Sequence, residues 1–279
     1  MRKRVIVGLG LLPIGLGVIY FGDILYAVVV AIVLGIGCYE FINVFKTQNN
    51  RPAVMLAVVG AVLIPFARYF AFQQELSFFA YDSLLFGIFI LLAMTYHLFA
   101  YERGWDKAGS DFTITVAGIA YFGMLGGYLL VLRYLPGGLG WVLTVLPAVW
   151  LADSGAYFFG SWLGRTPFSP RLSPKKTREG FIAGIISGAL LTVLWVWATS
   201  PLLGDLTLVT LLQAGILGLI LAILTPLGDL GASMFKRQFS IKDFGSIIPG
   251  HGGIFDRIDT WLWAAFIGYY VISIFFLSA

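Results

Sequence analysis

Residues 24–45 read ILYAVVVAIVLGIGCYEFINVF, a nearly continuous run of apolar side chains. A helix needs about 20 apolar residues to cross the hydrocarbon core of a bilayer, and this run is long enough. Comparable runs follow one another along the chain, separated by short polar loops. The stretch therefore predicts a membrane-spanning helix, and the recurrence of such runs predicts a protein that crosses the membrane many times.

The composition of the whole chain leads to the same class of fold. Apolar residues make up 59% of the 279 residues, charged residues only 11%, and the mean hydropathy is +0.91. A soluble domain carries about 25% charged residues, so this chain lacks the polar surface that water requires. The predicted fold class is all-α, in the form of a polytopic integral membrane protein.

Nine segments are long and apolar enough to be predicted as spans. They are residues 5–22, 24–45, 53–72, 78–100, 112–135, 141–163, 179–199, 207–235 and 256–277. The first follows a basic start and resembles a signal peptide, but no small-residue cleavage site follows it, so an uncleaved span is favoured. The least typical are 53–72, which contains Arg68, and 207–235, which is long enough to tilt or to extend beyond the membrane.

Charge counting sets the orientation of these spans. With the N-terminus inside, all of the 18 Lys and Arg residues except Arg68 and Arg133 fall on the cytoplasmic side. Cytoplasmic loops of membrane proteins carry this excess of positive charge. A pI near 9.1 is also typical of nucleic-acid binding, but these charges lie in short loops, so no nucleic-acid partner is expected. The prediction is a multi-pass protein of the cell membrane.

The two halves of the chain differ in their loops. Residues 1–135 are predicted to form an N-terminal transmembrane region, because their loops are short and their charges look topological. Residues 136–279 are predicted to form a catalytic transmembrane region, because the cytoplasmic loops 164–178 and 236–255 combine Gly and Pro with dense charge. No internal repeat at a fixed period is evident, which disfavours an inverted-repeat transporter.

A carboxylate within a span is the first candidate for chemistry. Asp153 lies inside the sixth predicted span, where a charge is costly and indicates a functional site by default. The alternative is a structural partner for a buried cation. In the loop that follows, Thr177 is a candidate N-cap for the next helix. Lys175, Lys176 and Arg178 would then crowd a helix N-terminus, which suits phosphate; a purely topogenic basic loop is the alternative.

The stretch after residue 225 places four polar side chains at helical spacing. Asp229, Ser233, Lys236 and Arg237 occupy positions i, i+4, i+7 and i+8, so on a helix they share one face. The predicted arrangement is a carboxylate one turn below a serine, with two cations at the cytoplasmic mouth.

A glycine-rich loop follows this helix. It begins after Lys242 and Asp243 and includes His251, Gly252 and Gly253. Glycines allow the backbone to approach a ligand closely. For His251, phosphate contact or proton handling and a simple hydrogen bond within the loop are equally weighted interpretations.

The last predicted span opens with two carboxylates. Asp256 and Asp259 are at i and i+3, so they face the same way, and Arg257 stands between them. Two or three carboxylates are what Mg²⁺ uses when it also binds substrate phosphates. The alternative role for both aspartates is capping of the helix and interaction with its dipole.

Together these residues resemble the C-terminal signature of the phosphatidate cytidylyltransferases, the CDP-diacylglycerol synthases. The match runs from Ser233-Met234-Phe235-Lys236-Arg237 through Lys242-Asp243-Phe244-Gly245 to His251-Gly252-Gly253-Ile254-Phe255-Asp256-Arg257-Ile258-Asp259. We call residues 233–259 the signature segment. The stretch around Asp153 and residues 173–180 resemble two further family segments, whereas the first half of the chain agrees only in length and hydropathy.

The resemblance implies a reaction of CTP with phosphatidic acid that yields CDP-diacylglycerol and pyrophosphate, in phospholipid biosynthesis. It also implies a homodimer and one or two Mg²⁺ ions at a centre that draws on Asp229 and Asp256. Asp153 and Asp259 are expected as further ligands or as groups that orient the ligands. Catalytic roles are expected for Lys236, Arg237, Lys242, Asp243, His251 and Arg257, and phosphate binding for Lys175, Lys176, Arg178, Ser233, Gly252 and Gly253.

This chemistry suits the residue types. The nucleophile is a phosphate monoester that is largely ionised at pH 7, because its second pKa is about 6, so no serine nucleophile is needed. Catalysis then rests on positioning and electrostatics. Two alternatives stay open: a CTP-dependent cytidylyltransferase for another lipid phosphate, and a transporter or scramblase of anionic lipids. The second is disfavoured because the charges cluster on one side of the predicted spans.

Overall fold

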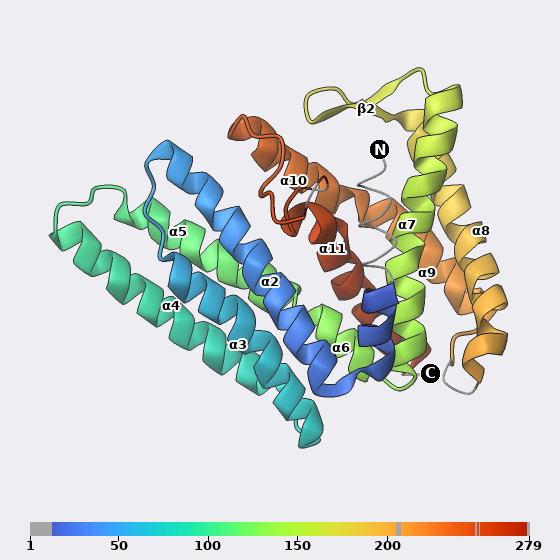
Figure 1. Cartoon of the computed structure of the whole chain (residues 1–279), viewed down its shortest axis with the longest axis horizontal. Coiled ribbons are helices and arrows are strands. Elements are labelled where there is room, and N and C mark those ends of the chain that lie inside the picture. Colours follow the sequence, from blue (N-terminus) through green and yellow to red (C-terminus); the bar gives the residue numbers. More distant parts are fainter. Residues whose placement is uncertain (1–12, 205–207, 249, 251, 278–279) are drawn as a thin grey trace. The chain divides into compact units, whose positions relative to one another are not determined.

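The computed structural model describes residues 13–204, 208–248, 250 and 252–277 (Figure 1). Within these residues the chain is helical apart from its loops and one two-stranded sheet. Eight helical segments of this described part are long and apolar enough to cross a membrane. The predicted all-α, polytopic membrane fold is therefore confirmed. Residues 5–12 of the predicted span 5–22 lie outside the described residues, and residues 13–21 are helical.

The chain divides into two compact units. Unit 1 comprises Met1–Val131 and Phe239–Ile258, and unit 2 comprises Leu132–Gln238 and Asp259–Ala279. Two helices run across the boundaries along the chain, α6 (Tyr128–Tyr134) and α11 (Phe255–Val271). The functional division predicted after residue 135 stays a prediction, because compactness does not report function.

Unit 1 is a helical assembly with small side chains at its contacts. Its elements are α2 (Asp23–Phe45), η1 (Lys46–Gln48), α3 (Val54–Gln73), α4 (Phe78–Glu102), α5 (Ala108–Gly118) and the π-helical η2 (Ile119–Leu125). In Figure 1, α3 lies between α2 and α4, and η2 also packs on α3. A Cβ on Gly60 would meet Ile119 at 3.1 Å, so this glycine lets α3 and η2 approach closely.

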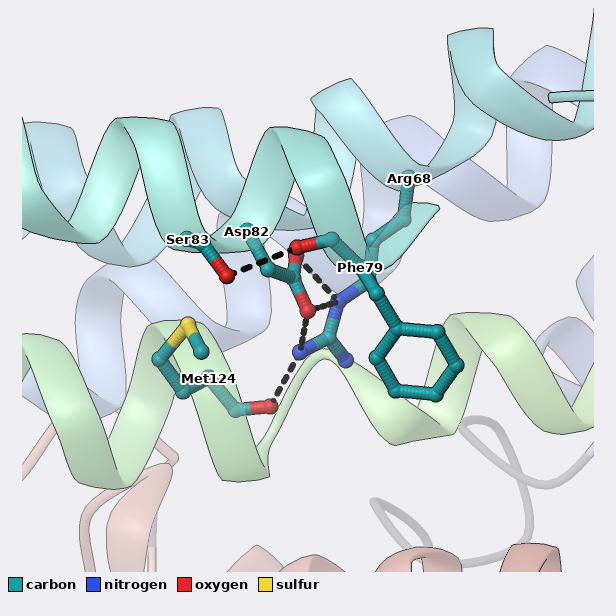
Figure 2. A network of polar contacts seen from close by, with 5 residues as sticks. All are labelled: Arg68, Phe79, Asp82, Ser83 and Met124. Atoms are coloured by element: carbon teal, nitrogen blue, oxygen red, sulfur yellow. Dashed lines mark hydrogen bonds and ion pairs between the residues drawn. The ribbon is translucent and has the colours of Figure 1, made fainter. Parts of the chain in front are cut away.

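A buried ion pair explains the one guanidinium in the predicted span 53–72 (Figure 2). Arg68 is fully buried and donates from Nη2 to Asp82 Oδ2 at 2.9 Å and from Nε to Asp82 Oδ1 at 3.0 Å. Its Nη2 also donates to the carbonyl of Met124 in η2 at 2.6 Å. The guanidinium carbon lies 4.5 Å from the centre of the Tyr128 ring. A charge within a span is tolerated when such partners satisfy it.

Unit 2 packs three long helices and carries the sheet. Its elements are α7 (Gly138–Leu163), β1 (Pro167–Ser169), β2 (Ser173–Thr177), α8 (Arg178–Leu203), α9 (Leu211–Leu224), α10 (Pro226–Gln238) and η4 (Ile272–Phe276). α8 packs on both α7 and α9. A Cβ on Gly155 of α7 would lie 1.7 Å from Ser187 Oγ of α8, so only glycine fits this crossing.

The boundaries of the unit 2 helices follow local sequence signals. The side chain of Thr177 accepts a hydrogen bond from the Gly180 amide at 3.1 Å, which confirms the predicted N-cap. α9 opens with a capping box formed by Thr210 and Gln213. Pro226 begins α10, where its missing amide proton interrupts the hydrogen-bond ladder after α9. The long predicted span 207–235 is therefore two helices, an apolar α9 and a polar α10.

Candidate functional site

α10 carries four of the predicted site residues on one helix, as their spacing indicated. The side chains of Asp229, Ser233 and Lys236 are partly buried, and that of Arg237 is exposed. A Cβ on Gly228 would lie 2.6 Å from the carbonyl oxygen of Asp259, so the absence of a side chain brings the start of α10 against α11. The backbones that carry the predicted ligands Asp229 and Asp259 therefore touch within unit 2.

The basic hairpin supplies a cation to Asp229. Lys176, on β2, places its Nζ 2.5 Å from Asp229 Oδ2, and both side chains are about one third exposed, at 36% and 30%. Asp153 of α7 is exposed and lies within electrostatic range of both Lys176 and Asp229. The structure thus brings together three predicted site residues from three elements of unit 2, as one ammonium group and two carboxylates.

Contacts of the hairpin with the flanking helices hold it in this position. β1 and β2 pair antiparallel, with Pro167 opposite Thr177 and Ser169 opposite Ser173. Glu179 Oε2 accepts the amides of Arg165 and Thr166, each at 3.1 Å. Arg237 Nε donates to the carbonyl of Leu172 at 3.2 Å, between the two strands. Arg237, predicted as a catalytic cation, therefore also connects α10 to the hairpin tip.

The loop within the signature segment closes around Asp256. We call residues 239–254 the signature loop; all belong to unit 1, and 249 and 251 lie outside the described residues. The buried Asp256 accepts the amides of Phe244 at 2.8 Å and Gly253 at 3.1 Å on its Oδ2 atom. The Ile248 amide donates to the Gly252 carbonyl at 3.1 Å. Asp256 therefore organises this loop, in addition to its predicted role as a metal ligand.

The two glycines predicted to bind phosphate are tightly enclosed. Gly252 has φ +81°, a conformation that favours glycine, and a Cβ there would lie 3.1 Å from Asp243 Oδ1. A Cβ on Gly253 would lie 2.4 Å from Glu40 Oε2. The Gly253 amide is already engaged by Asp256. The predicted contact of these glycines with phosphate stays a prediction.

The remaining predicted residues occupy simpler positions. Asp259 is buried and accepts the Thr260 amide at 2.7 Å on its Oδ1 atom. His251 lies outside the described residues. Four further predicted cations have exposed side chains, as Arg237 does: Lys175, Arg178, Lys242 and Arg257.

Sequence reasoning missed one carboxylate, Glu40 of α2. Its side chain is only 4% exposed, and its Oε2 accepts the Phe255 amide at 2.9 Å across 215 residues of sequence. The same signal that singled out Asp153, an ionisable side chain inside an apolar span, applies to Glu40 as well. Only the fold, however, connects it with the signature loop.

The donor groups fit a magnesium ion that is shared with a substrate. In the described part of the chain, no three His, Cys, Asp or Glu side chains gather in a way that would hold a metal ion by themselves. Mg²⁺ is usually bound by one or two carboxylates together with substrate phosphates and water. Asp229, which pairs with Lys176, and Asp153, which lies within electrostatic range of both, are suitable for such a shared ion.

A membrane-embedded helical fold with carboxylates and cations gathered at the hairpin defines a membrane enzyme that handles anionic groups. A model of the cytidylyltransferase family matches residues 2–275, so the chain belongs to this family of nucleotidyltransferases.

Three relatives extend this match. The chain is 30% identical to the phosphatidate cytidylyltransferase of Bacillus subtilis (strain 168), over 99% of this chain and 98% of the relative. It is 27% identical to that of Synechocystis sp. over 97% of this chain and 96% of the relative. It is 37% identical to that of Staphylococcus haemolyticus, over 62% of this chain and 64% of the relative. The similarity therefore includes the first half of the chain, which contains none of the family motifs described above.

Proposed function

We propose that this protein is a phosphatidate cytidylyltransferase, which forms CDP-diacylglycerol and pyrophosphate from CTP and phosphatidic acid. The observation that carries the proposal is the similarity over nearly the whole chain to the phosphatidate cytidylyltransferase of Bacillus subtilis. The pairing of Lys176 with Asp229 supports it, because the reaction requires cations and carboxylates at one place. In this role the protein serves phospholipid biosynthesis.

The reaction joins two anions. An oxygen of the phosphatidic acid phosphate attacks the α-phosphorus of CTP, the bond from this phosphorus to the bridging oxygen breaks, and pyrophosphate leaves with the electron pair. Both reactants are negatively charged, so the protein must neutralise and align them. The exposed cations Lys175, Arg178, Lys242 and Arg257 are our candidates for binding the phosphates.

Bound Mg²⁺ would neutralise the triphosphate and the departing pyrophosphate. We assign Asp229 and Asp256 as its main ligands, with Asp153 and Asp259 as additional ligands or as groups that orient them. Lys176 forms an ion pair with Asp229, and its ammonium group would be available to a substrate phosphate when Asp229 binds a metal ion.

The proposal also covers the side of the membrane on which the active site lies and the oligomeric state of the protein. The hairpin and signature loop belong to the predicted cytoplasmic side, where CTP is found, and the acyl chains of phosphatidic acid remain in the bilayer. The positive charge of these loops supports this orientation. We further propose a homodimer, on the basis of the family resemblance alone.

Turnover by the purified full-length protein tests the proposal. Detergent-solubilised protein is incubated with radiolabelled CTP and phosphatidic acid, with and without Mg²⁺, and the label in the lipid phase is counted. We expect lipid-soluble label only when both phosphatidic acid and Mg²⁺ are present. A folded protein that labels an ether-linked or polyprenyl phosphate but not phosphatidic acid would overturn the substrate assignment. Equal labelling in EDTA would overturn the metal requirement.

A further inference from the structure

Glu40 connects the N-terminal spans to the signature loop. Its carboxylate is 4% exposed, and Oε2 accepts the amide of Phe255, the first residue of α11. Phe255 precedes Asp256, whose own carboxylate binds the amides of Phe244 and Gly253. Asp256 therefore links residue 244 of the signature loop to residue 253, and Glu40 binds the residue at which α11 begins, directly after the loop.

The glycines of the signature loop fit around this carboxylate. A Cβ on Gly245 would lie 2.1 Å from Glu40 Oε1, and a Cβ on Gly253 would lie 2.4 Å from Glu40 Oε2. Only residues without a side chain leave space for Glu40 at these two positions. The glycines that resemble the family signature are therefore required, at least in part, by a carboxylate that lies outside the signature.

The burial of the Glu40 carboxylate carries a cost in free energy. Glu40 Oε1 is buried and has no hydrogen-bond partner within the described part of the chain. An unsatisfied buried oxygen costs about 1–3 kcal/mol, and more when the group is charged. An apolar side chain would fill the space in α2 without this cost. An apolar side chain, however, could not accept the Phe255 amide, which Glu40 does.

We propose that Glu40 is a positioning residue for the cytidylyltransferase reaction: by binding the start of α11 it sets the signature loop, and with it Asp256, in the geometry that substrate requires. The effect is transmitted through the hydrogen bond to the Phe255 amide and through the fit against Gly245 and Gly253. The N-terminal spans thereby acquire a specific role in catalysis. This inference rests on the proposed function of the signature segment.

Three substitutions of Glu40 separate its hydrogen bond from its charge and its volume. Glu40→Gln keeps the size and an oxygen that accepts the Phe255 amide. Glu40→Asp keeps the negative charge, but its side chain is one methylene shorter, so the carboxylate no longer reaches the Phe255 amide. Glu40→Ala removes the carboxylate. Glu102→Ala, at an exposed carboxylate on α4 of the same unit, is the matched control. For each variant, turnover per folded molecule and hydrogen exchange of the Phe244, Gly253 and Phe255 amides are measured.

We expect Glu40→Gln and the control to stay within about threefold of the wild-type kcat, with wild-type exchange. Glu40→Asp and Glu40→Ala should lose about tenfold to 100-fold in kcat, because a small displacement of reacting groups has effects of that size. Their loop amides should exchange faster while the helices of unit 2 stay protected. Hydrogen exchange does not depend on the substrate, so a wrong substrate assignment leaves this readout intact. If Glu40→Ala does not fold, Glu40→Asp provides the comparison.

Two results would overturn the proposal. The first is full turnover per folded molecule in Glu40→Ala and Glu40→Asp, because the loop would then be set without Glu40. The second is loss of turnover in Glu40→Gln with unchanged hydrogen exchange of the loop amides. Turnover would then depend on the charge of Glu40 and not on positioning through its hydrogen bond.

A double-mutant cycle tests the fit against the glycine. Gly245→Ala should reduce turnover in the wild type, since its Cβ overlaps Glu40 Oε1, but should add little in the Glu40→Ala background, where the carboxylate is gone. Gly253→Ala is the contrasting variant, because its Cβ would also lie 2.7 Å from the Gly245 amide nitrogen. This overlap with the backbone remains in the Glu40→Ala background, so the loss of turnover should remain as well. Additive effects of Gly245→Ala and Glu40→Ala would contradict the proposed contact.

Discussion

At the scale of single residues, the ion pair of Lys176 and Asp229 is the most informative contact of unit 2. The two side chains come from β2 and α10, and Asp153 of α7 lies within electrostatic range of both. In the proposed site, a metal ion and a substrate phosphate would bind beside this lysine and these two carboxylates. The pair is therefore a natural point at which to test the metal assignment.

Lys176→Met should strengthen metal binding in the absence of CTP. Removal of the ammonium group leaves Asp229 and Asp153 without their cation, and a partly exposed ion pair contributes up to about 1 kcal/mol, which corresponds to about fivefold in Kd. Mn²⁺ binding is measured by electron paramagnetic resonance on the full-length protein. Lys175→Met, at the exposed neighbour, is the control. Equal Mn²⁺ affinity in Lys176→Met and the wild type would show that no metal competes with Lys176.

Asp229→Asn and Asp256→Asn should each reduce turnover by at least about 100-fold, because an amide is a poor ligand for Mg²⁺. The asparagine at position 256 retains an oxygen that accepts the Phe244 and Gly253 amides, so the signature loop should stay ordered. Radiolabel transfer is the assay, and Asp106→Asn, at an exposed loop position, is the control. Normal turnover in either variant would remove that residue from the metal site.

At the scale of elements, the buried Arg68 of α3 forms a hydrogen bond with the π-helical η2. A π-helix changes the pairing of backbone carbonyls, and Arg68 donates to one of them, that of Met124 (Figure 2). The same guanidinium neutralises Asp82 of α4. The Arg68 side chain of α3 thus joins α4 to η2. An apolar side chain at this position could not donate a hydrogen bond to the Met124 carbonyl.

Arg68→Met should destabilise unit 1 by about 3–5 kcal/mol, because it leaves the carboxylate of Asp82 buried and unpaired. The double variant Arg68→Met with Asp82→Leu should recover much of this loss, since no uncompensated charge remains. Thermal unfolding in detergent is the measurement. A double variant as unstable as Arg68→Met would assign the loss to the Met124 carbonyl rather than to the ion pair.

At the scale of the whole molecule, eight candidate spans in the described part of the chain support a multi-pass protein. The side on which the hairpin and the signature loop lie follows only from the distribution of Lys and Arg. Sidedness is accessible to labelling, because the single native thiol, Cys38, is buried.

In a Cys38→Ala background, Glu75→Cys should react with a membrane-impermeant maleimide on intact cells. Arg171→Cys, at the hairpin, should react only after the cells are opened. The positive-inside distribution is the physical reason for this expectation. Labelling of Arg171→Cys in intact cells would place the hairpin outside and would contradict a site that uses cytoplasmic CTP.

Local properties of the sequence accounted for much of the fold. Hydropathy predicts the spans because a helix of about 20 consecutive apolar residues matches the thickness of the bilayer core. Thr177 was identified as an N-cap, and the spacing from Asp229 to Arg237 as one helix, because both depend only on nearby residues. Residues 207–235 are predicted as one span but form two helices that divide at Pro226, although proline is itself a local signal.

Composition, short-range spacing and motif are enough to predict the class of protein and the residue types of the site. The partners of these residues depend on the folded chain: Arg68 pairs with Asp82, Lys176 with Asp229, and Glu40 with Phe255. The physical reason is that hydrogen bonds and ion pairs require atoms within about 3 Å. Which distant residues come that close depends on how the helices pack, and no single stretch of sequence encodes that packing.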